Sequence, residues 1–219
     1  MKRLLLAIGG LVLVSALFLL IALSPPPRPT PQGGPASQPP VLTLGENEKE
    51  VALQIALRDE RIQGLLRGAN WTLVESGPWT SNGELIGAVL LIRLSSPRWV
   101  SGSFAELGGN PYRADLWLGS LHVFVNFKEG RVVALSPGVA RAPHDPPLRD
   151  KTVETARGVA LSRVPGASAA ILNAIFYTER FPRGLALFVT VDGKGESLVA
   201  VDLARMSVVE NYSGPVIRG

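Results

Sequence analysis

Residues 125–135 read VNFKEGRVVAL, and residues 201–211 read VDLARMSVVEN. Each stretch has the pattern of a strand, a turn and a short valine-rich strand. A constant offset of 76 positions aligns three valines of the first stretch with three of the second: Val125 with Val201, Val132 with Val208, and Val133 with Val209. Similarity at a constant offset indicates a repeated structural unit. We therefore expect a module that occurs twice along the chain.

The predicted helices and strands also come in the same order in the two parts of the chain. Residues 46–68 have the pattern of a helix, because five apolar side chains recur at helical spacing before Gly68: Val51, Ile55, Ile62, Leu65 and Leu66. Residues 150–163 form a second helical pattern that Pro165 and Gly166 end. Strand patterns occupy residues 71–74, 85–94, 116–127 and 131–135 after the first helix, and residues 174–178, 185–191, 197–203 and 206–211 after the second.

These patterns predict an α+β fold that contains two related modules, each a helix followed by an antiparallel meander. The first module covers residues 42–141 and the second covers residues 148–219, with a Pro-rich break between them. Glycines in the segments 129–130 and 192–195 supply the turn residues that hairpins require. Both modules follow one N-terminal transmembrane helix.

Residues 4–24 form a mainly apolar stretch of 21 residues without a charged side chain, directly after Lys2 and Arg3. A helix of this length covers about 31 Å, which matches a hydrocarbon core about 30 Å thick. The stretch is longer than the apolar part of a usual signal peptide, and Pro25 follows its only small-residue cleavage site. We therefore expect residues 1–24 to remain as a membrane anchor with the rest of the chain outside the cytoplasm. Secretion after signal cleavage is the alternative.

Residues 25–41 form a linker with eight prolines between positions 25 and 40. Proline lacks the amide donor that helices and sheets need, so this segment is expected to act as a tether. The net charge of +4 does not indicate nucleic-acid binding, because beyond Val41 the chain has 19 basic and 18 acidic residues, a balance of +1. Cysteine is absent, which excludes disulfides and thiolate metal sites.

The helix-then-strands order of the second module, which ends in VAVDLARMSVVENYSG, resembles the PepSY type of small extracytoplasmic domain. The first module, with ALRDERIQGLLRG before WTLVESGPW, resembles the same class or the cystatin-like modules at the front of copper amine oxidases. The resemblance covers about residues 44–214. It implies inhibitory or interaction modules outside the membrane, and it carries no catalytic set that could be transferred to this chain.

A stretch rich in aromatic residues and glycines, residues 99–117, separates two strand patterns of the first module. Long loops that carry aromatic side chains often form recognition surfaces, because Trp and Tyr offer a large contact area at low entropic cost. We expect four aromatic residues to pack in the core or within this loop: Trp99, Phe104, Tyr112 and Trp117. The sharper hypothesis is that the loop that carries them forms part of a protein-binding surface.

The residues that commonly carry catalysis show no catalytic pattern. The only histidines are His122, expected on the strand face that carries Phe124, and His144 in the Pro-rich break. A metal site would need these two to converge with Asp115 and Asp145, and their spacing does not require it. No serine lies in a nucleophile elbow and no phosphate loop is present. We therefore predict no catalytic, metal or cofactor site.

Taken together, the sequence favours a membrane-anchored, extracytoplasmic binding or regulatory module without catalysis. Its partners would be the membrane, through residues 4–24, and a protein of the cell envelope. One alternative is an inhibitor of an exported peptidase, which agrees with the PepSY-like resemblance. Another is a small envelope hydrolase or metal-dependent enzyme.

Overall fold

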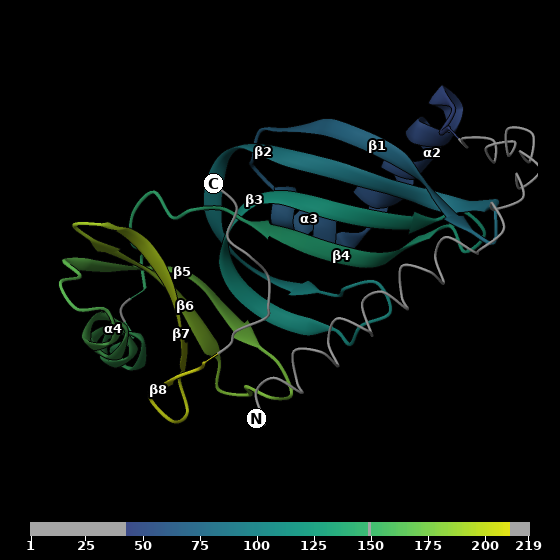
Figure 1. Ribbon diagram of the computed structural model, residues 1–219. Helices are drawn as coiled ribbons and strands as arrows, with labels where there is room; N and C mark the ends of the chain where they lie inside the picture. Colours follow the sequence, from purple (N-terminus) through teal and green to yellow (C-terminus); the bar gives the residue numbers. More distant parts are fainter. Residues whose placement is uncertain (1–42, 149, 211–219) are drawn as a thin grey trace, which may run out of the picture. The chain divides into compact units, whose positions relative to one another are not determined.

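The computed structural model describes residues 43–148 and 150–210, which belong to the unit formed by residues 42–219. This part has three helices and one eight-stranded antiparallel sheet, which confirms the predicted α+β class (Figure 1). Within these residues no helix is long and apolar enough to cross a membrane. The expected anchor and linker lie outside the described residues.

Two short helices replace the single helix expected over residues 46–68. Helix α2 spans Glu46–Arg58, helix α3 spans Glu60–Leu66, and Asp59 lies between them with extended backbone angles. The N–H of Asp59 donates to the carbonyl of Ala56, and its side chain accepts from the N–H of Arg61 at 3.0 Å. An Asp side chain that bonds the backbone nearby competes with continuous helix, and this explains the break.

The expected apolar stripe is correct for α3 and wrong at Val51 in α2. Ile62, Leu65 and Leu66 are all buried, whereas Val51 is 49% exposed. Helix α2 instead buries two small residues one turn apart, Ala52 and Ala56. Alanine side chains let a helix approach a sheet closely, so the buried face is rotated by about one residue from the predicted one.

The first four strands form a meander. Strand β1 spans Trp71–Ser81, β2 spans Glu84–Phe104, β3 spans Tyr112–Asn126 and β4 spans Arg131–Val139. Helices α2 and α3 cover one face of this sheet, and the core there is built from the alternate side chains Ala88, Leu90, Ile92, Leu121, Val123, Val125 and Leu135. The turn expected at residues 129–130 joins β3 to β4, and Gly130 has φ +61° there.

Strands β2 and β3 continue past the β1–β4 meander and bend together around α3 (Figure 1). Arg93 pairs with Ser120 while Arg98 pairs with Leu118, so residues 94–97 of β2 bulge opposite a single residue of β3. Bulges of this kind increase strand bending. Just after β2 ends, Ala105 exchanges two backbone hydrogen bonds with Leu135 of β4, at 3.1 and 2.8 Å.

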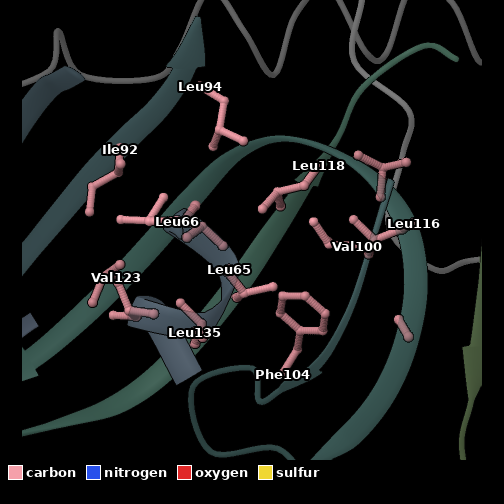
Figure 2. Close-up of a cluster of buried hydrophobic side chains, with 14 of the residues drawn as sticks. Leu65, Leu66, Ile92, Leu94, Val100, Phe104, Leu116, Leu118, Val123 and Leu135 are labelled. Carbon is pink, nitrogen blue, oxygen red and sulfur yellow. The ribbon is translucent and has the colours of Figure 1, made fainter. Parts of the chain in front are cut away.

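The bend places Phe104 inside the first core. Figure 2 shows its ring close to Leu65 of α3, with Val100 and Leu116 beside them. Phe104 has no exposed surface. Burial of a side chain of this size contributes about 1.5–3 kcal/mol, so the bent hairpin and α3 stabilise each other.

The second half repeats the order of helix then strands. Helix α4 spans Lys151–Arg163, β5 spans Ala169–Tyr177, β6 spans Leu185–Asp192, β7 spans Gly195–Asp202 and β8 spans Ser207–Val208. Four residues of β5 pair with the first part of β3, and this joins both halves into one sheet. A second core cluster lies under α4 and includes Val153, Ala156, Leu172, Phe188 and Val201. Asp192 accepts hydrogen bonds from the N–H groups of Lys194 and Gly195 at the β6–β7 turn, as the sequence predicts.

Candidate binding surface

The four aromatic residues expected on a loop lie instead on two paired strands. Trp99 is directly opposite Trp117, and Phe104 is directly opposite Tyr112, across the β2–β3 ladder. The irregular region is limited to residues 105–111. The expectation of a long loop was wrong. The Gly, Ser and Pro residues in this stretch suggest an end to the strand, but a bulge between Arg93 and Arg98 lets β2 continue to Phe104.

Two of these four aromatic side chains are inside the protein. Phe104 has no exposed surface and Trp117 is only 5% exposed. The rings of Trp99 and Trp117 meet edge to face at 6.1 Å, and Tyr112 lies 6.0 Å from both Phe104 and Phe176. Trp99 and Tyr112, both half-buried, keep some surface that a partner could contact.

The residues considered for a metal site are held apart by different partners. The ring of His144 contacts Trp117 edge to face at 4.9 Å, and His122 lies opposite Leu91 on another part of the sheet. Asp145 forms an ion pair with Arg157 at 2.8 Å. Within residues 43–148 and 150–210, no cluster of three or more His, Asp or Glu side chains is arranged to hold a metal ion.

Asp115 belongs to a small polar cluster on the sheet. The hydroxyl of Tyr177 donates to Oδ2 of Asp115 at 2.9 Å, and the guanidinium of Arg113 lies 4.4 Å from the centre of the Tyr177 ring. Burial raises the pKa of Tyr177, and the hydrogen bond to the Asp115 carboxylate raises it further. The phenol therefore stays protonated at neutral pH and acts as a hydrogen-bond donor.

The face of the β1–β4 sheet opposite α2 and α3 also carries apolar and aromatic side chains. We call it the open face and define it by five half-buried residues: Trp79, Val89, Leu91, His122 and Phe124. Its apolar members neither join the two core clusters of the described residues nor pack against them. His122 lies there with Phe124, as its position in the alternating strand predicts.

The aromatic side chains of the open face are held in place by the sheet beneath them. Trp79 lies over Gly87 on the neighbouring strand, where an added Cβ would come within 2.8 Å of the indole. The Trp79 ring also meets Phe124 edge to face at 6.0 Å. The glycine therefore leaves room for a large aromatic ring close to β2.

The sequence contains a signal for this face. The run IGAVLLI in β2 is apolar at every position except its glycine, which is typical of a strand covered on both faces. In the structure α2 and α3 cover only one of these faces. The excess of apolar residues over simple alternation therefore marks the open face.

No protein-family model, curated protein or solved structure matches this chain. The resemblance to PepSY-like domains remains a prediction.

Proposed function

We propose that this protein is a membrane-anchored, extracytoplasmic binding or regulatory module that captures another protein through the open face and performs no catalysis of its own. The observation that carries the proposal is an apolar, aromatic sheet face outside both cores of the described residues. Antiparallel sheets that face water normally present polar residues on that side. An apolar face is instead typical of a surface that a partner covers.

The composition of the open face suits reversible protein binding. Complete burial of each large apolar side chain would contribute about 1.5–3 kcal/mol, against an association cost of about 4–15 kcal/mol. Trp79 and Phe124 supply rigid aromatic area of the kind that dominates binding energies. Glu75, Arg93 and Ser120 border the face and provide a polar rim.

The anchor and the module organisation complete the proposal. Residues 4–24 would hold the protein in the membrane, and residues 25–41 would extend the folded part away from the lipid. Two related PepSY-like modules, residues 42–141 and 148–219, are supported by equivalent strand pairs. Val125 pairs with Val132 between β3 and β4, and Val201 pairs with Val208 between β7 and β8, at the same offset found in the sequence.

The test is affinity capture of partners from native membranes by the full-length protein. A Leu91→Glu variant places a charge in the open face and is expected to reduce capture roughly tenfold or more, as loss of an interface hot spot does. Leu198→Glu is the matched control, because Leu198 is 43% exposed on β7, outside that face. Undiminished capture by a folded Leu91→Glu protein would overturn the proposal. If the partner is an exported peptidase, the same variants test inhibition.

A further inference from the structure

The segment that joins the two halves crosses the edge of β5. We call residues 140–148 the strap. The strap begins where β4 ends, with the N–H of Ala140 donating to the carbonyl of Trp117 at 2.8 Å. The carbonyl of Ala140 accepts from Nδ2 of Asn173 at 2.9 Å. From Arg141 to Pro147, the described structure has no strap main-chain hydrogen bond to the sheet or to α4.

Beneath the strap, the part of β5 before Ala174 has no neighbouring strand on one side among the residues that the structure describes. Its pairing with β3 covers only Ala174 to Tyr177, whereas its pairing with β6 extends back to Ala169. The outward backbone groups of Ala170 and Leu172 therefore need other partners.

Two charged side chains take the place of the missing strand. Oδ1 of Asp145 accepts from the N–H of Leu172 at 3.4 Å, and the Arg157 guanidinium donates to the carbonyl of Ala170. Arg157 and Asp145 also bind each other at 2.8 Å. Burial lowers the pKa of Arg157, but its contacts with Asp145 and Glu154 outweigh this and raise it overall. Without Asp145 of the strap, the site would present a guanidinium and the amide donor of Leu172, while the carbonyl of Ala170 stays bound by Arg157.

The same site holds polar atoms without partners. Trp117 is 5% exposed and Asn173 is 1% exposed, and both contact the strap through Ala140. Within the described residues, Nε1 of Trp117 and Oδ1 of Asn173 are buried without a hydrogen-bond partner. The first is a donor and the second is an acceptor, so a peptide backbone could satisfy both.

We propose that the site under the strap binds an extended, Pro-rich peptide with an acidic residue. In the structure the strap itself occupies this site in place of the peptide. The strap itself has this chemistry. Its segment RAPHDPPL, residues 141–148, is rich in proline, places His144 against the Trp117 ring and directs Asp145 to Arg157. Pro-rich segments bind aromatic surfaces with little loss of entropy, and the carboxylate complements the guanidinium.

A partner peptide can compete with the strap for this site. The strap depends mainly on side-chain contacts, and Asp145 is 51% exposed while Arg157 is 19% exposed. Segments with few backbone hydrogen bonds to the rest of a protein open at low free-energy cost. This site differs from the open face in position and in chemistry, so it does not depend on the function proposed above.

The probe for this proposal is a capped synthetic peptide, RAPHDPPL, added to the full-length protein in detergent and measured by calorimetry. An Asp145→Asn substitution weakens the internal strap, so the variant is expected to bind the probe roughly tenfold more tightly than the unmodified protein. A probe with Asn in place of its Asp should lose that affinity. Arg157→Gln combined with Asp145→Asn should lose it too.

The controls distinguish a strap that covers a peptide-binding site from a strap that only stabilises the fold. Arg131→Gln removes a cation from the β3–β4 hairpin, where it pairs with Glu129, and should bind the probe as the unmodified protein does. Equal affinity for the Asp and Asn probes would overturn the proposal. Equal affinity of the Asp145→Asn variant with and without Arg157→Gln would overturn it too. If the Asp145→Asn variant does not fold, amide hydrogen exchange of the unmodified protein tests whether the strap opens. The Leu172 amide must exchange faster than the Phe188 amide, and equal protection of the two would contradict a strap that opens.

Discussion

At the scale of single residues, Asp59 shows how one side chain ends one helix and starts the next. Its carboxylate accepts two hydrogen bonds from the Arg61 guanidinium, at 2.9 and 2.6 Å, and one from the Arg61 amide. Burial alone would raise the pKa of Asp59, but the hydrogen bonds and charge of Arg61 outweigh it and lower that pKa below its ordinary value. The charged form of Asp59 therefore stabilises the fold.

Asp59→Asn should destabilise the protein at neutral pH by about 1 kcal/mol or less, because Asn keeps the helix cap but loses the ion pair, which is partly screened by solvent. Since the folded-state pKa is lowered, the contribution of Asp59 is complete above its unfolded pKa of about 3.9 and is lost as the pH falls through the folded value. Urea unfolding of both proteins at neutral and acidic pH measures this. A stability difference that persists in acid would contradict the explanation.

At the scale of elements, β2 determines both the core and the open face. Its side chains alternate between Ala88, Leu90 and Ile92 toward the helices and Val89 and Leu91 toward the open face. Gly87 is the position where β2 approaches its neighbours most closely. An added Cβ there would come within 1.9 Å of the carbonyl oxygen of Val125 on β3.

Gly87→Ala should destabilise the protein by about 1–3 kcal/mol or more, because neither the β3 backbone nor the Trp79 ring can move without disturbing the sheet. Denaturant unfolding measures the loss, and tryptophan fluorescence reports the displaced indole. Gly77→Ala is the control, since it lies opposite Val89 on β1 and its Cβ would meet nothing within 4 Å. Equal stability of the two alanine variants would contradict this close approach at Gly87.

At the scale of the whole described unit, both halves contribute side chains to the first core cluster. The first cluster, built around α2 and α3, also includes side chains from the second half: Ala174, Phe176, Leu185, Leu187 and Ala200. The opposite face of β5 and β6 packs against α4 through Leu172 and Phe188. These central strands therefore belong to both halves.

A chain that ends at residue 141 should not fold cooperatively, because it lacks the part of the first cluster that β5 to β7 supply, each large side chain contributing about 1.5–3 kcal/mol. Thermal unfolding followed by near-ultraviolet circular dichroism tests this against the full chain. Leu187→Ala provides a milder test, with an expected loss of about 2–5 kcal/mol that should match that of Leu90→Ala. A sharp transition of the shortened chain would show that its half folds independently.

The sequence by itself determined the α+β class, the position of most strands and the turns at residues 129–130 and 192–195. These depend on spacing, on glycine and on neighbouring side chains, which are local properties. The tertiary structure alone decided that β2 runs on to Phe104, that Trp117 is buried and that Asp145 reaches Leu172. It also decided which face of β2 remains open. Each of these depends on contacts between residues far apart in the chain, which local spacing cannot specify.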